Sequence, residues 1–249
     1  MKRNIKLILE YDGTNYHGWQ SQVGSGSPTI QDTLEQALNS LTGEVTKTYA
    51  SGRTDAGVHA LGHVANFMTE STIPSRAWAP AINHFLPDDI KVLISEEVPL
   101  DFHARYSARG KCYTYRILNR SAPSALYRNH AWHVNVRLNI KSMRLAAASL
   151  IGEHDFSAFR GAGCTARTPV RTIQSVVLRN KGAFVEIVME ADAFLRHMAR
   201  NITGTLVEVG LGRFRVDEVK RILESRNRAF AGRTAPSQGL FLVKVYYSD

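Results

Sequence analysis

Cysteine is scarce in this chain of 249 residues: there are two, Cys112 and Cys164, and no Cys-x-x-Cys pair. The count excludes a disulfide framework and argues against a cysteine-based zinc site, so we expect a reduced, cytoplasmic protein. Long apolar runs are lacking too. The first run stops at Leu9, before Glu10 and Asp12, so we expect no signal peptide. No stretch approaches the ~20 apolar residues of a membrane span, and we expect no membrane partner.

Acidic residues are outnumbered, with 22 Asp and Glu against 31 Lys and Arg and a formal net charge of +9. Such an excess is typical of proteins that bind polyanions, most often nucleic acids. Between His103 and Arg120 there is no acid, and Tyr106, Tyr113 and Tyr115 lie among the basic residues. This mixture suits RNA, because cations attract phosphates and rings stack on unpaired bases. It also fits a solvated strand face with core tyrosines, and the residues alone leave both interpretations open.

In the first half of the chain, the hydrophobic pattern predicts the order strand, helix, strand, strand, helix, strand. Apolar residues alternate from Ile5 onward, as in a half-buried strand. Ser27-Pro28 is typical of a capped helix start with a first-turn proline, and a one-sided apolar face follows it. A short flexible loop is expected at Gly24–Ser27. The predicted elements cover residues 5–11, 28–41, 45–50, 63–68, 78–85 and 90–95.

The second half repeats that order with one added strand. A hairpin is expected across Asn180-Lys181-Gly182, and the chain closes with a strand. Two copies of a split βαβ pattern predict an α+β fold with two related halves, each with helices on one face of a mainly antiparallel sheet. We place the halves at residues 1–105 and 106–249. The predicted elements cover residues 111–118, 132–136, 140–150, 172–178, 183–190, 194–209, 217–224 and 240–246.

The segment Ser51–Ala60 reads SGRTDAGVHA and combines two glycines with charged side chains. Each glycine costs roughly 0.5–1 kcal/mol inside a helix, relative to alanine. The segment therefore predicts a tight loop that presents a single carboxylate, Asp55. An ordinary surface turn is the alternative, because Asp-x-Gly is common turn chemistry.

This loop resembles the signature loop of the bacterial tRNA pseudouridine synthase A family. Further segments are similar to that family in the same order, so the resemblance covers nearly the whole chain. They begin at Glu10 (EYDGTNYHGWQ), Arg109 (RGKCYTYR), His154 (HDFSAFR), Phe194 (FLRHMARN) and Gly239 (GLFLVKV).

The resemblance implies a fold and an activity. The two sheets would join into a pseudouridine-synthase-like core with a central cleft for the substrate. The protein would be an isomerase that converts uridine to pseudouridine at positions 38, 39 and 40 of the tRNA anticodon arm, and it would act as a homodimer. The residues alone specify neither those positions nor the dimer.

The resemblance also assigns roles to single residues. Asp55 is the catalytic aspartate, which either attacks the nucleoside or abstracts a sugar proton. Tyr113 stacks on the target base, and its hydroxyl would help to move a proton at C5, whereas Tyr115 keeps a core role. Arg200 pairs with the catalytic carboxylate, and Arg53 engages the extruded base or a phosphate. From helical spacing, Arg196 and Arg200 would lie on one face, where a surface pair is the alternative.

We expect neither cofactor nor metal. An isomerisation needs no electron carrier or group donor, and the sequence has no Walker loop. His59 and His63 have the i,i+4 spacing of zinc ligands on a helix, but Gly57 and Gly62 make a helix there improbable, and no third ligand is evident.

A catalytically silent RNA-binding α+β protein is the alternative function, because split βαβ folds often present a sheet to RNA. Asp55 distinguishes the two: a carboxylate repels a phosphate backbone, so a binding module gains nothing from it, whereas an enzyme needs it. The presence of Asp55, Tyr113 and Arg200 together favours the enzyme.

Overall fold

The computed structural model describes residues 1–21 and 26–248. The chain forms two compact units. Unit 1 comprises Met1–Arg109 and Leu242–Asp249, and unit 2 comprises Gly110–Phe241. Part of the loop expected at Gly24–Ser27 lies outside the described residues. No helix in the described part of the chain is long and apolar enough to cross a membrane.

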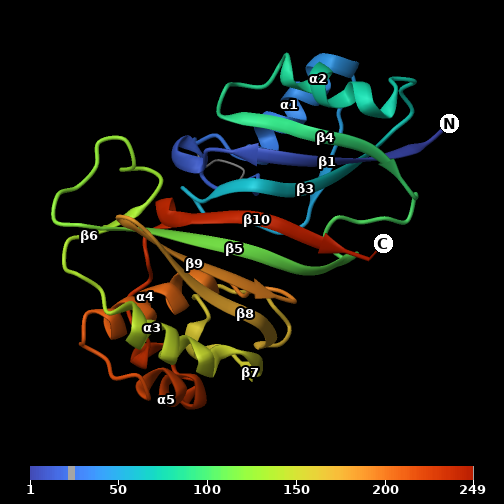
Figure 1. The fold of residues 1–249 in the computed structure, drawn as a ribbon. Helices are drawn as coiled ribbons and strands as arrows, with labels where there is room; N and C mark the ends of the chain where they lie inside the picture. The colour runs from blue at the N-terminus through green and yellow to red at the C-terminus, as the bar shows by residue number, and fades with distance from the viewer. Residues whose placement is uncertain (22–25, 249) are drawn as a thin grey trace. The chain divides into compact units, whose positions relative to one another are not determined.

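Unit 1 is built on a sheet with the strand order β4-β1-β3-β10, in which β1 pairs antiparallel with both β3 and β4. In β1, the alternate residues Ile5, Leu7 and Leu9 are fully buried, which confirms the predicted alternation. The helices α1 (Ile30–Thr42) and α2 (Trp78–Asn83) pack on each other, and α2 packs on β4 (Figure 1). The strands are β1 (Arg3–Tyr11), β2 (Thr48–Ala50), which pairs with β3, β3 (His59–Thr69), β4 (Ile90–Val98) and β10 (Leu240–Tyr247).

Helix α1 begins two residues later than predicted. Its N-cap is Thr29, whose hydroxyl accepts a hydrogen bond from the amide of Asp32. The expectation that Ser27 caps the helix and Pro28 occupies its first turn is therefore wrong. Thr29 is buried and its Oγ1 also donates to Asp32 Oδ2 at 2.6 Å, so a reciprocal cap fixes the helix start.

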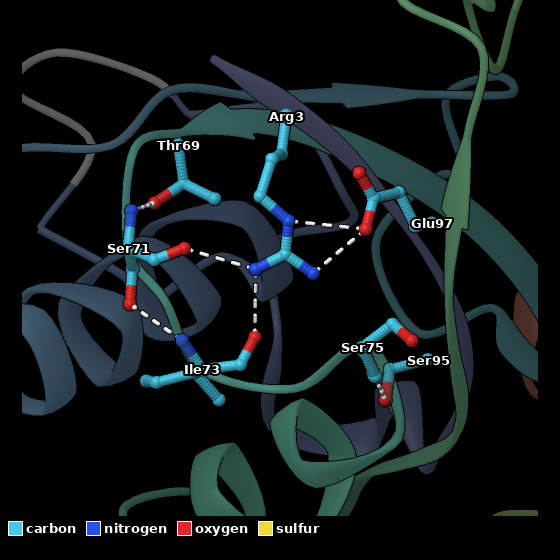
Figure 2. A network of polar contacts seen from close by, with 7 residues as sticks. All are labelled: Arg3, Thr69, Ser71, Ile73, Ser75, Ser95 and Glu97. Carbon is cyan, nitrogen blue, oxygen red and sulfur yellow. Dashed lines mark hydrogen bonds and ion pairs between the residues drawn. The ribbon is translucent and has the colours of Figure 1, made fainter. Parts of the chain in front are cut away.

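Arg3 connects three segments at the edge of unit 1 through hydrogen bonds of its guanidinium group (Figure 2). Its guanidinium donates to Glu97 Oε2 on β4 at 2.7 and 3.0 Å. It also donates to the carbonyl oxygens of Ser71 and Ile73, at 2.9 and 2.8 Å, in the connection that leaves β3. One cation thus ties β1, β4 and the segment after β3 together.

Unit 2 is built on an antiparallel sheet with the strand order β5-β9-β8-β7, and the short strand β6 pairs in parallel with β5. The helices gather beside β8: α3 (Ile140–Ala147) packs on α4 and β8, and α5 (Glu218–Ser225) packs on α3 (Figure 1). The strands are β5 (Ala108–Asn119), β6 (Trp132–Val134), β7 (Gly152–Asp155), β8 (Val170–Lys181) and β9 (Phe184–Ala191). The sequence pattern did not predict β7.

Helix α4 (Met198–Gly210) starts four residues after the predicted start at Phe194. The chain turns just before it, because His197 adopts a left-handed conformation with φ 60°. Arg196 therefore precedes the helix, and the prediction that Arg196 and Arg200 share a helical face is wrong. Each unit combines a mainly antiparallel sheet with helices, so the predicted α+β class is confirmed.

Candidate active site

Asp55 lies in the loop that joins β2 to β3 in unit 1, as the glycine-rich pattern predicted. The loop is anchored at its start by Ser51, whose amide donates to Val64 O at 2.8 Å. It turns at Asp55, whose carbonyl accepts from the Val58 amide at 3.1 Å, and Gly57 follows with φ 74°. Asp55 is half-buried, whereas Arg53 is exposed. A rigid strand on either side thus positions a partly accessible carboxylate.

The turn from Asp12 to Trp19 supports this loop from the other side. The Trp19 amide donates to Thr54 O at 3.1 Å, and the Gly57 amide donates to Tyr16 O at 3.3 Å. A Cβ atom on Gly18, which has φ +84°, would lie 2.4 Å from Thr54 O. A Cβ atom on Gly13 would lie 2.0 Å from Val58 O. The two backbones approach so closely that only glycine fits at both positions.

A buried polar network lies beneath the loop, and sequence reasoning missed it. The Tyr11 hydroxyl is 2.9 Å from Thr54 Oγ1 and 2.8 Å from His63 Nδ1. The ring of Trp19 lies 4.1 Å from that of His63, between centroids. Taken singly, each of these residues is typical of an ordinary core; Tyr11 and His63 meet because β1 pairs with β3.

His59 and His63 lie on β3 and not on a helix, as the neighbouring glycines indicated. Both rings are buried. The Nδ1 atom of His59 lies 3.1 Å from the Gly13 amide nitrogen and 3.0 Å from Asp12 Oδ1. His63 Nδ1 contacts Tyr11. Both histidines therefore brace the first strand and turn against β3.

A second tyrosine fixes the supporting turn. The Tyr16 hydroxyl donates to Asp89 Oδ1 at 2.6 Å. Burial, and then this hydrogen bond and the nearby carboxylates, raise the pKa of the Tyr16 phenol well above its usual value. Tyr16 therefore stays a neutral donor at physiological pH.

Tyr113 and Tyr115 lie on β5 and are both buried, with 8% and 0% exposure, whereas Tyr106 is 76% exposed. The Tyr113 ring meets the ring of Phe194 edge-on at 4.9 Å. The Tyr115 hydroxyl donates to Pro236 O at 2.7 Å. In this segment Tyr113 and Tyr115 are therefore buried, whereas Tyr106 is on the surface, and the base-stacking role of Tyr113 stays a prediction.

Arg200 is anchored at the first turn of α4. Its Nε donates to Ala235 O at 2.8 Å, and its own carbonyl accepts from the Ala235 amide at 3.1 Å. Burial raises the pKa of Tyr115, and the positive charges of Arg200 and Arg233 oppose that shift. Arg200 is half-buried, so the alternative of a plain surface arginine does not describe it.

Asp55 and Arg53 belong to unit 1, and Tyr113 and Arg200 belong to unit 2. Within each unit, the residues expected at the site lie on elements that neighbouring segments hold tightly. The pairing of Asp55 with Arg200 joins the two units and stays a prediction.

Comparison with known proteins identifies the family. The family model described as tRNA pseudouridine synthase matches residues 7–107 and 146–248. The chain is 54% identical to tRNA pseudouridine synthase A of Acetivibrio thermocellus over 245 residues, covering 98% of this chain and 100% of that protein. It is 47% identical to tRNA pseudouridine synthase A 2 of Clostridium tetani, with both chains covered completely. The supported loop that carries Asp55 lies within the matched residues, and the chain belongs to the tRNA pseudouridine synthase family.

Proposed function

We propose that this protein isomerises uridine to pseudouridine in the anticodon arm of tRNA, at positions 38, 39 and 40, with Asp55 as the catalytic carboxylate. The reaction breaks the C1′–N1 bond of the nucleoside, rotates the uracil and forms the C1′–C5 bond. C5 loses a proton and N1 gains one, so substrate and product are isomers. The side chains of the protein therefore need only hold the base and move protons.

The observation that carries the proposal is the setting of Asp55. Two strands, the Asp12–Trp19 turn and a buried network hold its loop, yet the residue itself is only half-buried. Holding a reactive group in a productive geometry lowers the barrier by avoiding reorganisation during the reaction. A loop that served only as a surface turn would need none of this support.

We further assign roles to three residues by the family resemblance. Tyr113 stacks on the uracil, and Arg200 orients the Asp55 carboxylate, for which its anchored guanidinium is suited. Arg53 engages the extruded nucleotide, and its exposure supports that role. The half at residues 1–105 would thus supply the acid, and the half at 106–249 would supply the ring and the arginine that orients it.

We also propose a cytoplasmic homodimer. Both cysteines are thiols, as suits a reducing compartment. The dimer follows from the family resemblance, and sedimentation of the purified protein with and without tRNA tests it.

Asp55→Asn tests the function directly. Unmodified tRNA carrying tritium at uridine C5 is incubated with each protein, tritium release is followed, and pseudouridines are mapped by chemical modification and primer extension. We expect wild type to modify the anticodon arm and Asp55→Asn to lose at least ~10³-fold in rate. The variant should still bind tRNA, because the substitution removes a negative charge that repels the phosphate backbone.

The matched control is Asp88→Asn, which removes a carboxylate from the same unit at a fully exposed position. It should retain wild-type turnover. If wild type bound tRNA tightly and released no tritium from any transcript, the silent RNA-binding protein would be the correct description.

A further inference from the structure

We propose that unit 1 carries a stacking platform for unpaired RNA bases, separate from the Asp55 loop. It consists of the rings of Tyr49, His103 and Tyr106 with Lys47 and Arg105 at its ends, and we call it the aromatic ladder. This inference rests on the proposed function, since it assigns part of the RNA substrate to a second surface.

The rings of the ladder follow one another closely. The centroids of Tyr49 and His103 are 5.2 Å apart, and those of His103 and Tyr106 are 4.4 Å apart. Lys47 Nζ lies 5.9 Å from the Tyr49 centroid, and Arg105 Cζ lies 5.5 Å from the Tyr106 centroid. A row of three rings therefore has a cation at each end, within the ≈6 Å at which cations interact with aromatic faces.

The outer rings are accessible. Tyr106 is 76% exposed and Tyr49 is 38% exposed. A cluster of exposed aromatic side chains with cations is typical of a surface that binds a partner, because such side chains contribute little to the folded core. The five residues include no acid, which favours a partner with flat π faces and negative charge. Unpaired nucleotides have both, because every base can stack and every phosphate attracts a cation.

The backbone beneath the ladder is held firmly. In the turn from His103 to Ser107, the Ser107 amide donates to His103 O at 2.9 Å, and the His103 amide donates to Ser107 Oγ at 3.1 Å. The buried Ala104 between them donates its amide to Asn66 Oδ1 at 2.9 Å. Its carbonyl accepts from the Tyr247 hydroxyl at 2.8 Å. The exposed rings thus stand on a preorganised base, which lowers the entropic cost of binding.

The ladder and the catalytic loop share strand β2. Tyr49 lies on β2, and Ser51 begins the loop directly after it. Five residues lie between Tyr49 and Asp55, so the Cα atoms of Tyr49 and Asp55 lie at most ~22 Å apart. One RNA loop can therefore place one base at Asp55 and another unpaired base of the same loop on the ladder.

The test measures RNA binding by the full chain with the double variant Tyr49→Ala/Tyr106→Ala and with Tyr106→Ala alone. The probes are a fluorescein-labelled oligouridylate, a double-stranded RNA of equal length and an unmodified tRNA transcript. We expect the double variant to bind oligouridylate about tenfold or more weakly, and duplex RNA almost as wild type does. Tyr106→Trp keeps an aromatic ring at this position and should bind oligouridylate about as wild type does. The matched control is Phe85→Ala, which removes an exposed ring that meets His84 edge-on in the same unit.

Two further readouts separate the outcomes. Oligouridylate containing 4-thiouridine should photo-crosslink to Tyr106, and melting curves should show the single variant folded. The proposal would be overturned if both variants bound oligouridylate as wild type does. It would also be overturned if the variants lost self-association but kept RNA binding, because the ladder would then be a contact between protein chains. Failure of the proposed function is distinct, because wild type itself would then form no pseudouridine.

Discussion

The Asp55 loop of unit 1 and the start of helix α4 in unit 2 are held in place in different ways. Beneath the Asp55 loop, the supporting contacts come from the backbone of the Asp12–Trp19 turn and from the Tyr11 network. At the start of α4, Arg200 itself makes the contact, through its side chain and its carbonyl, to Ala235. One region positions a segment; the other positions a particular side chain.

In both regions, however, the backbone of a glycine packs closely against a backbone carbonyl oxygen. A Cβ atom would lie 2.4 Å from Thr54 O at Gly18, and 1.7 Å from Arg233 O at Gly204 in α4. The two regions should therefore respond differently to substitution. In unit 1, Gly18 lies outside the loop that carries Asp55, so a substitution at Gly18 should shift Asp55 from a distance. In unit 2, the contact is made by Arg200, so a substitution of Arg200 itself removes it.

The largest effect is expected for Gly18→Ala. The new methyl group would collide with the backbone of Thr54, and alanine would have to adopt a positive φ, so we expect a loss of about 3 kcal/mol or more in the free energy of unfolding. Tritium release should fall as well, because the Asp55 loop must shift. Chemical denaturation and single-turnover rates measure the two effects.

Gly43→Ala is the matched control for that prediction. Gly43 has φ +73°, but a Cβ atom there would meet nothing within 4 Å. The substitution therefore reports the cost of the positive φ alone. Equal losses for the two variants would mean that the close approach of Gly18 to Thr54 does not hold the loop.

Arg200→Leu should have an intermediate effect. It removes the donor to Ala235 O, a carbonyl of a fully buried residue, and an unsatisfied buried acceptor costs about 1–3 kcal/mol. Turnover should fall further than stability predicts if Arg200 also orients Asp55. Arg196→Leu is the control, since Arg196 is exposed and precedes the helix. Wild-type rates for Arg200→Leu would contradict the role assigned to Arg200.

The smallest effect is expected for Glu97→Gln at the edge of unit 1. The hydrogen bond from Arg3 lowers the pKa of Glu97 below its ordinary 4.5. The ion pair therefore stabilises the fold above the ordinary pKa, and this contribution is lost as the pH falls through the lowered value. The melting temperatures of wild type and Glu97→Gln should differ slightly at neutral pH and converge in acid, with turnover unchanged at neutral pH.

The sequence could predict the elements and the loop because both depend on local patterns. Alternation in β1 and the glycine density around Asp55 are visible in a few residues. The start of α4 was misplaced because Phe194 and Leu195 continue the apolar pattern up to His197, and a left-handed φ at a histidine leaves no such signal.

The support of the loop could not be predicted, since it depends on strand register. Tyr11 and His63 are 52 positions apart and meet only because β1 pairs with β3. The difference in exposure between the tyrosines could not be predicted from the sequence either. Tyr106 and Tyr113 both lie in one basic segment, and only the structure shows that the former is exposed and the latter buried.

The route of the chain has a consequence for its synthesis. Residues from Leu242 onward belong to unit 1 together with Met1–Arg109, and all of unit 2 is inserted between them. Translation proceeds from the N-terminus, so unit 1 waits for β10 while the whole of unit 2 is made. On the ribosome, the unit that begins first is completed last. The loop that carries Asp55 therefore gains its complete scaffold only after unit 2 has been made.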